Sequence, residues 1–181
     1  MRFLAGLLAA LQLASFAGDG CRLAIGMKSG WLLRLHVVAQ DDTEEMQRIK
    51  ECVRDAVQDA YAQGAQPGSM LSNARRLLPT LTQAAEDCAH VEGFTGQVRV
   101  CLETRAFDAR ELDGVTVPAG VYPALMVYLG DAAGHNWWGL LDPALAWRCA
   151  GGDGAHTGWD WSLDGLWAAL RTLWRPVQEG V

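Results

Sequence analysis

Apolar and polar residues alternate over residues 31–39 in the way typical of a strand. Arg34 and His36 are two residues apart, so both side chains would point to the same face of that strand. The polar residues that follow, among them Asp41 and Asp42, end the strand and supply caps for a helix. The sequence therefore predicts a strand with a polar face, followed by an acidic turn.

A helical period comes next. Apolar side chains recur every three or four residues over residues 46–60, and the opposite face is polar and includes the neighbours Arg54 and Asp55. A short helix is predicted over residues 70–77. Pro79 suits the first turn of a third helix, because its missing N–H has no helical partner there in any case.

The second half of the chain predicts strands. Residues 98–105 alternate loosely, and an Asp-Gly pair marks a turn at residues 113–114. Residues 115–117 and 121–129 flank a Pro-Ala-Gly turn, which indicates a hairpin, and Pro123 makes the start of its second strand an edge or a bulge. The order of elements predicts an α/β (α+β) fold. It has two layers, a mostly antiparallel sheet with helices packed on one face, and a C-terminal helix.

The N-terminus has the features of a signal peptide over residues 1–20. Arg2 precedes an apolar run over residues 3–14, and small residues occupy peptidase positions within residues 15–17. A buried first helix and an uncleaved anchor are the alternatives. The domain itself is expected over residues 28–147.

Tryptophan dominates the C-terminal part, since seven of the eight Trp residues lie from Trp137 onward. A Gly-rich linker is predicted over residues 148–158 and a Trp-rich helix over residues 159–175, which could cover the domain, pair with another chain or lie at a membrane interface. Of the adjacent Trp137 and Trp138, one should pack inward and the other should be partly exposed as a contact site.

Composition excludes some functions. The 181 residues carry a net charge of −6, which argues against a nucleic-acid partner and against docking on anionic lipid. No catalytic motif and no set of metal ligands is visible, so neither a cofactor nor a metal is expected. The five cysteines are an odd number. Cys52, Cys88 and Cys101 are interpreted as small buried apolar residues, whereas Cys21 and Cys149 cannot be paired.

Four runs occur in an order that points to one family. Residues 34–42 (RLHVVAQDD) are similar to RLHVIANSD, and residues 47–57 (QRIKECVRDAV) to DQxLKxxVRDAV. Residues 117–125 (VPAGVYPAL) are similar to LPAGEYEAL, and residues 130–143, which contain Asn-Trp-Trp, to GxGxGxNWWCVLFPPLC. Over about residues 31–147, the chain resembles the stage II sporulation protein R family.

This resemblance implies an exported signal of endospore formation. Such a protein is made in the forespore and secreted into the space between the forespore and mother-cell membranes. There it activates a membrane-embedded aspartic protease of the mother cell, which then processes the sporulation sigma factor E precursor. The chain itself would not be an enzyme, and it would touch the membrane only through its leader or its receptor. Two family cysteines are replaced here by Gly139 and Ala146.

The expected partner-binding surface combines the polar strand, the acidic turn and the Asn-Trp-Trp segment. The ion pair of Arg54 with Asp55 would support it. Two alternatives stay open: an exported cell-wall hydrolase with His36 or His135 as its base, and an envelope-binding module that uses Trp side chains as platforms. The predicted contact residues are Arg34, His36, Asp41, Asp42, His135, Asn136, Trp137 and Trp138.

Overall fold

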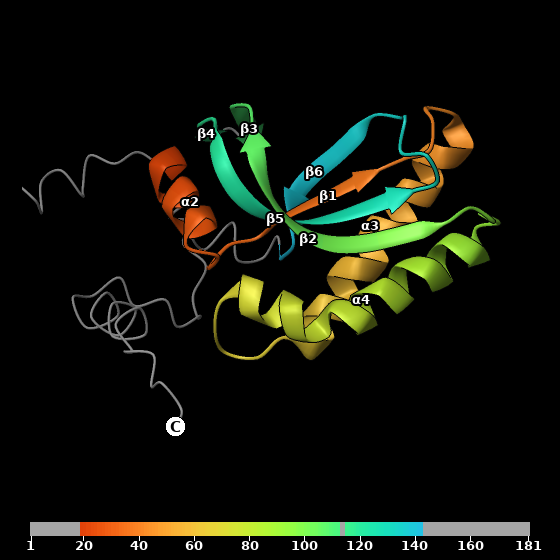
Figure 1. The fold of residues 1–181 in the computed structure, drawn as a ribbon, viewed down its shortest axis with the longest axis horizontal. Helices are drawn as coiled ribbons and strands as arrows, with labels where there is room; N and C mark the ends of the chain where they lie inside the picture. Colours follow the sequence, from red (N-terminus) through yellow and green to blue (C-terminus); the bar gives the residue numbers. More distant parts are fainter. Residues whose placement is uncertain (1–18, 113–114, 143–181) are drawn as a thin grey trace, which may run out of the picture. The chain divides into compact units, whose positions relative to one another are not determined.

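The computed structural model describes residues 19–112 and 115–142 (Figure 1). The predicted linker and the predicted C-terminal helix lie outside these residues, as does nearly all of the predicted leader. Within the described part, three helices and six strands follow one another along the chain.

Four strands form the main sheet, in the order β2, β5, β1, β6. Their bounds are Val98–Phe107 for β2, Gly120–Leu129 for β5, Arg34–Val38 for β1 and Asn136–Leu140 for β6. β1 runs parallel to β5, whereas the β2–β5 and β1–β6 pairs are antiparallel. The predicted α+β class with a mostly antiparallel sheet is confirmed.

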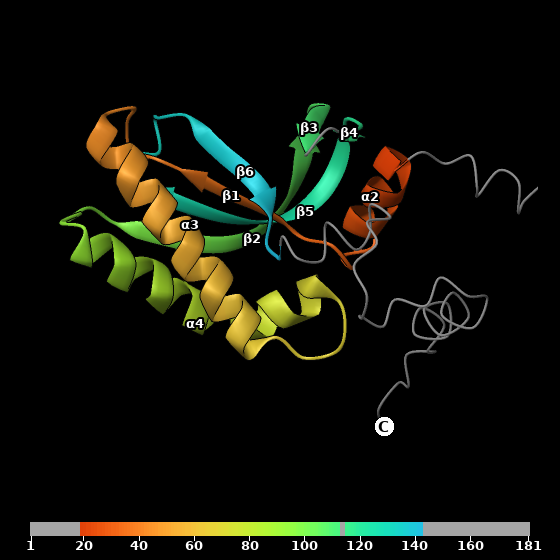
Figure 2. The same cartoon turned by 180° about the vertical axis from the view of Figure 1, so that it is seen from behind.

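Two long helices, α3 (Glu44–Gly64) and α4 (Met70–Val91), cover one face of this sheet, as the view from behind shows (Figure 2). Alternation along the strands directs Leu35 of β1 and Leu125 of β5 to this helix-covered face, and both are fully buried. The helix-covered face is therefore the hydrophobic core of the domain.

The start of α3 is fixed by the turn that the sequence indicated. The Thr43 hydroxyl accepts the Met46 N–H at the helix N-terminus. Asp41 in turn accepts the Thr43 N–H at 3.0 Å and the Thr43 hydroxyl at 2.6 Å. Asp41 thus holds the capping residue in place.

Pro79 lies inside α4, so the prediction of two helices over this segment is wrong. Proline removes one helical hydrogen bond, but the apolar stripe continues on both sides of it through Leu77, Leu81 and Ala85, which are all buried. The packing of this stripe outweighs the loss of one backbone bond, and Pro79 itself is exposed.

Cys52 of α3 and Cys88 of α4 form a disulfide, with their Cα atoms 6.2 Å apart. The interpretation of these two cysteines as simple apolar residues is therefore wrong. Helical periodicity placed both on apolar stripes, and the two stripes face each other in the helical layer. The disulfide ties together the two helices that cover the sheet.

The predicted Pro-Ala-Gly hairpin is also wrong. β3 (Arg110–Leu112) pairs with β4 (Val115–Val117), and the register continues that of β2 with β5. Two residues on each arm, at positions 108–109 and 118–119, interrupt the pairing, and the register of the two arms is the same before and after this gap. The Pro-Ala-Gly segment is therefore a break within one arm of a long hairpin, and the outer pair β3–β4 bends away from the main sheet (Figure 1).

β5 is central in the sheet, although it contains Pro123. Pro123 pairs with Thr104 of β2 and lies one residue before Ala124, where the ladder with β1 begins. The start of β5 is thus flanked on one side only, which agrees with the predicted edge position.

α2 (Asp19–Lys28) was not anticipated from the sequence. Leu23, Ala24 and Met27 recur at helical spacing and belong to the core, so the core includes residues upstream of position 28. Residues 19 and 20, at the end of the predicted leader, are helical and belong to α2. Among the helices within residues 19–112 and 115–142, none has the length and hydropathy needed to cross a bilayer.

Candidate functional site

The second face of the sheet, which we call the open face, is covered by neither α3 nor α4 and is turned toward the viewer in Figure 1. Alternation directs Arg34 and His36 of β1 to this face. His36 is paired in register with Trp138 of β6, and Asn136 lies two residues before Trp138 on the same face. Phe107, at the end of β2, completes the group. Residues far apart in sequence therefore meet on the open face.

Arg34 is buried among aromatic rings, with 1% of its surface exposed. Its guanidinium carbon lies 4.7 Å from the ring centroid of Phe107 and 4.8 Å from those of Tyr122 and Trp138. These are cation–π distances. The Tyr122 hydroxyl donates to the Pro118 carbonyl at 2.8 Å, which ties this ring to the break in the long hairpin.

The same guanidinium has unsatisfied hydrogen-bond donors. Nε and Nη2 of Arg34 are buried and have no hydrogen-bond partner. Burial lowers the pKa of Arg34, and the neighbouring charge of Arg110 lowers it further, while the interaction with Tyr122 raises it. Arginine remains charged at neutral pH despite such shifts, so the domain holds a buried positive charge without an ion pair on those atoms.

His36 lies beside Arg34 and is also buried, with 2% of its surface exposed. Its ring stacks on Phe107, with centroids 4.6 Å apart and an interplanar angle of 14°. Burial lowers its pKa to about 4, and the positive charge of Arg34 adds to this shift, while the hydrogen bond with Asn136 opposes it. His36 is therefore neutral at pH 7.

Asn136 is the polar neighbour of His36. Its side-chain oxygen lies 3.2 Å and its side-chain nitrogen 2.8 Å from Nδ1 of the ring, and the tautomer of His36 decides which group donates. The other ring nitrogen, Nε2, is buried and has no hydrogen-bond partner among the described residues. Two side chains of one strand thus present three buried nitrogen atoms without partners.

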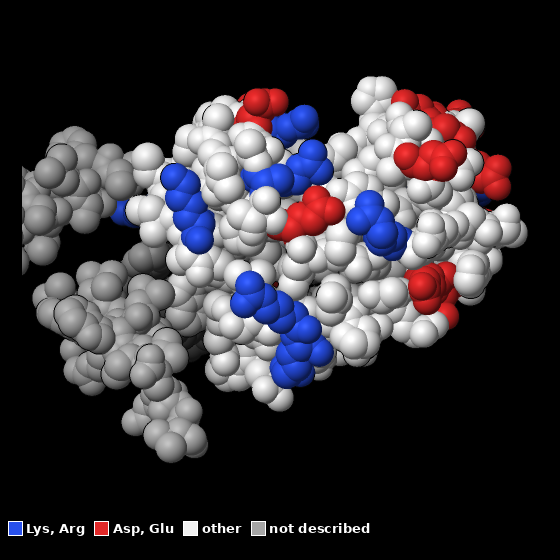
Figure 3. All heavy atoms as spheres, viewed as in Figure 1, with Lys and Arg blue, Asp and Glu red and all other residues white. Residues whose placement is uncertain are grey.

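These side chains line a pocket of about 660 Å³ on the open face. Arg105 and Arg110 also line it, and among the lining residues that the structure describes, Asp108 is the one acidic side chain. Seen from this side, Lys and Arg side chains spread across the middle of the molecule, and most acidic side chains gather toward the right-hand end (Figure 3). The pocket is locally positive in a chain whose net charge is −6.

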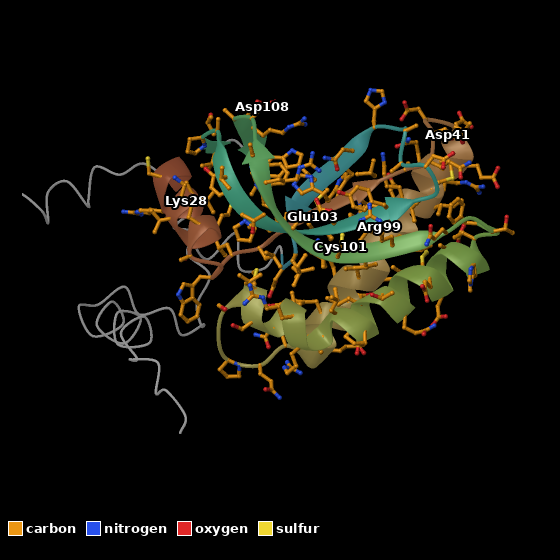
Figure 4. The ribbon with its side chains drawn as sticks, in the orientation of Figure 1. Lys28, Asp41, Arg99, Cys101, Glu103 and Asp108 are labelled. Atoms are coloured by element: carbon orange, nitrogen blue, oxygen red, sulfur yellow. A yellow bond between two sulfur atoms is a disulfide. The ribbon has the colours of Figure 1, made fainter. Side chains whose placement is uncertain are left out.

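A polar cluster on β2 borders the open face, and Figure 4 labels Arg99, Cys101 and Glu103 there. The thiol of Cys101 donates to Glu103 at 3.3 Å, and Arg99 lies 3.8 Å from the same carboxylate. Tyr128 also donates to Glu103, at 3.1 Å. Cys101 is half-buried in polar surroundings, so its interpretation as a buried apolar residue is wrong.

Asp42 and His135 form a second polar contact, between the acidic turn and the loop before β6. The Asp42 carboxylate lies 2.6 Å from Nδ1 of His135 and accepts the His135 backbone N–H at 2.7 Å. Gly134 donates its N–H to the Ala39 carbonyl at 2.9 Å, and a Cβ at this position would collide with the backbone of Asp41. The contact holds the start of β6, and hence Asn136, in place.

Trp137 and Trp138 point to opposite faces of the sheet, and both are half-buried. Trp138 packs on Arg34, whereas Trp137 lies under Arg54 of α3, whose guanidinium carbon is 5.3 Å from the ring centroid. The predicted ion pair of Arg54 with Asp55 is present at 2.7 Å. This ion pair therefore lies next to Trp137, on the helix-covered side of the sheet.

The structure divides the predicted contact residues into separate groups. Arg34, His36 and Asn136 line the pocket, and Trp138 packs on Arg34. Asp42 and His135 form the loop contact, Asp41 holds the helix-capping Thr43, and Trp137 lies on the other face. Sequence reasoning missed the residues that complete the pocket from the long hairpin. Alternation along residues 98–105 could have indicated that Arg105 shares a face with Arg99, but not that this face meets β1. The missed residues are Phe107, Tyr122, Arg105, Asp108 and Arg110.

No nucleophile accompanies the histidines in the described part of the chain. His36 is hydrogen-bonded to Asn136 and His135 to Asp42, and neither ring contacts a hydroxyl or thiol there. A general base acts best with a pKa near the working pH, and the lowered pKa of His36 does not meet that condition. Within residues 19–112 and 115–142, no three His, Cys, Asp or Glu side chains converge as metal ligands would.

Fold and site together define a small α+β domain with a positively charged pocket and neighbouring aromatic rings on one sheet face. The sequence profile of the family described as stage II sporulation protein R (spore_II_R) matches residues 29–150. The chain belongs to this family.

A curated relative, stage II sporulation protein R of Bacillus subtilis (strain 168), is 29% identical over 117 residues. This match covers 62% of the chain and 52% of the relative, so the chain spans about half of that relative's length. No solved structure matches the chain.

Proposed function

We propose that this chain is an exported signal of endospore formation that activates a membrane-embedded aspartic protease of the mother cell. The activated protease then processes the sporulation sigma factor E precursor. Family membership over residues 29–150 carries this proposal, since that is the role the resemblance implies. The open face supports it, because a pocket with buried, unsatisfied donors is typical of a site that a partner completes.

Export is part of the same proposal. Cleavage of the leader after Ala17 would start the exported chain at Gly18, directly before α2 and with the core intact. The disulfide between Cys52 and Cys88 agrees with an oxidising compartment. The intact mass of the secreted protein tests this point. A chain that starts between Gly18 and Cys21, at the end of the predicted leader, is expected, whereas cleavage C-terminal to Leu23, which would remove core residues of α2, would contradict the assignment.

Activation sets a thermodynamic requirement on binding. A ligand shifts a two-state protein only by binding one state better than the other. A shift from 1:99 to 99:1 in favour of the active state needs a preference of roughly 10⁴-fold, or about 5.5 kcal/mol. Buried aromatic and arginine side chains are the residue types that most often supply contacts of this strength. The open face holds such a group in Arg34, Phe107 and Trp138.

The test is reconstitution in a host that lacks the sporulation pathway. The secreted chain, the candidate membrane protease and the sigma factor precursor are co-expressed, and immunoblotting follows the size of the precursor. Cleavage that requires both this chain and its leader is expected. If the precursor stays intact although the chain is folded and exported, and an authentic activator works in the same cells, the proposed role is wrong.

The two adjacent tryptophans offer a matched pair of variants. Replacing both Trp137 and Trp138 with Ala should abolish activation. Trp138→Leu alone should do the same, because Trp138 packs on Arg34 at the pocket. Trp137→Leu should retain most activity, because Trp137 packs under Arg54 on the other face. Circular dichroism of each secreted variant shows whether it is folded. Equal activity of two folded single variants would remove the open face from the proposal.

A further inference from the structure

Among the described residues, no carboxylate forms an ion pair with the buried guanidinium of Arg34. Burial lowers the pKa of Arg34, Tyr122 raises it and the positive charge of Arg110 lowers it, and no carboxylate is among these causes. Asp108 lines the same pocket but is exposed. In Figure 4, Asp108 lies near β3 and Glu103 lies along β2. Glu103 is engaged by Tyr128. Among the described residues, the groups that lie against the guanidinium of Arg34 are the aromatic rings of Phe107, Tyr122 and Trp138.

Aromatic faces compensate only part of what burial costs. A ring interacts with the flat side of the guanidinium and leaves its N–H edge without acceptors. An unpaired buried charge is costly, and natural proteins pair such charges with a counter-ion. Water could accept the hydrogen bonds, but it would leave the charge uncompensated. An anion satisfies both needs.

The geometry of the unpartnered Arg34 nitrogens favours one shape of anion. Nε and Nη2, the two unpartnered atoms of Arg34, form one edge of the planar guanidinium. That edge presents two parallel N–H groups, which match the two oxygens of a carboxylate. Nε2 of His36 is a third unpartnered nitrogen in the same pocket, and it is a donor in the tautomer whose Nδ1 accepts the Asn136 N–H.

The pocket has room for more than a single ion. Its volume of about 660 Å³ lies within the range of sites that hold small organic ligands. Phe107 supplies a half-buried apolar wall, and Trp138 packs on the guanidinium of Arg34. Because Nε and Nη2 have almost no accessible surface, a neighbouring side chain must shift to admit the ligand. Entry of the ligand should therefore change the surroundings of Trp138 as well as those of Arg34.

We propose that the open-face pocket binds a carboxylate, and that the partner presents it as the side chain of an aspartate or glutamate. Arg34 forms a two-pronged ion pair with this carboxylate, and His36 donates from Nε2. Arg105 and Arg110 at the rim attract it. The identity of the partner rests on the proposed function, whereas the chemistry of the pocket does not.

The test is a titration of the secreted full chain, followed by nuclear magnetic resonance of the arginine Nε–H and tryptophan indole signals. The main probe is glutamate blocked as N-acetyl and α-amide, and its control is glutamine blocked in the same way. The glutamate probe should shift the Arg34 and Trp138 signals saturably, and the glutamine probe should not. Unchanged signals at tens of millimolar probe, with a folded protein, would overturn the proposal.

Further probes separate the sources of the anion. N-acetylalanine offers a C-terminal carboxylate, and inorganic phosphate offers a tetrahedral anion. Saturation by N-acetylalanine alone would overturn the side-chain source, and saturation by phosphate alone would overturn the carboxylate itself. These outcomes do not depend on the protease, so they are distinguishable from a failure of the proposed function.

Matched arginine variants complete the test. Arg34→Gln should weaken binding of the glutamate probe at least tenfold, and Arg34→Lys should weaken it too, because a lysine lacks the two-pronged edge. Arg99→Gln changes an arginine that is exposed on the same sheet face and paired with Glu103, and it should bind the probe as the wild type does. Binding that survives Arg34→Gln unchanged would overturn the assignment of Arg34.

Discussion

The two faces of one sheet follow different rules in this domain. On the helix-covered face, Leu35 and Leu125 are fully buried in an apolar core that α3 and α4 complete. On the open face, Arg34 and His36 are buried just as deeply but keep three nitrogen atoms without partners. Burial of Leu35 therefore stabilises the fold, whereas burial of its neighbours Arg34 and His36 costs free energy. The helix-covered face stabilises the fold, and the open face holds polar groups in a costly state that suits binding.

The largest effect is expected on the helix-covered face. Leu35→Ala removes a fully buried side chain and leaves a cavity between β1 and the helices, so the free energy of unfolding should fall by about 4 kcal/mol. Urea unfolding followed by circular dichroism measures this change. A loss below about 1 kcal/mol would mean that this face is not the tightly packed core described here.

The disulfide tests the helical layer in a second way. Replacing Cys52 and Cys88 with Ala opens a loop with a sequence separation of 36 residues, which should lower the free energy of unfolding by roughly 3–4 kcal/mol. Intact mass under non-reducing conditions first shows whether the bond is present. Cys101→Ala is the control, since Cys101 is a free thiol outside that layer, and it should change stability little. Equal effects of the two changes would contradict this account of the helical layer.

The open face should make stability depend on pH. Burial lowers the pKa of His36 from 6.5 to about 4, so the unfolded chain binds a proton more readily than the folded chain does. Stability is then complete above pH 6.5 and is lost as the pH falls toward about 4, by about 3 kcal/mol in total.

Urea unfolding at several pH values between 7 and 4 measures this loss. His36→Asn keeps a polar group near Asn136 and removes the titrating ring, so the slope between pH 6.5 and 4 should flatten. An unchanged slope in this variant would assign the pH dependence to other groups.

The smallest change in stability is expected at Arg34, although its burial equals that of Leu35. Arg34→Met exchanges an unpaired buried charge for an apolar chain of similar length. The lost cation–π contacts and the removed desolvation cost should nearly cancel, leaving the free energy of unfolding within about 1 kcal/mol of the wild type. Activation of precursor cleavage should nevertheless be lost. If Arg34→Met lowers the free energy of unfolding as much as Leu35→Ala does, Arg34 contributes to folding as the core does, and the proposed difference between the two faces is wrong.

The sequence predicted this contrast only in part. The period of two in residues 31–39 is enough to place Arg34 and His36 on one face of a strand. The family resemblance also assigns the Asn-Trp-Trp segment to the same predicted partner-binding surface. The pairing of His36 with Trp138 across 102 residues was not predictable, because register between distant strands leaves no local signal.

Some short motifs are compatible with two local structures, and the wrong one was predicted from the sequence. Pro-Ala-Gly occurs in tight turns and also in breaks within a strand. Here the pairing with β2 and β3 on the other arm of the hairpin makes it a break. Pro79 suits a helix start, yet apolar packing on both sides carries α4 through it. Cys52 and Cys88 gave an apolar pattern, and only the packing of α3 against α4 brings the two sulfur atoms together.

One measurement tests the central claim most directly, namely that the open face is the signalling surface. In the reconstituted system, Arg105→Glu reverses an exposed charge at the pocket, and Arg75→Glu reverses an exposed charge on α4, in the helical layer. With both variants folded and exported, the account predicts that Arg105→Glu abolishes precursor cleavage and that Arg75→Glu leaves it near the wild-type level. The reverse result, or equal activity of the two variants, would contradict the account.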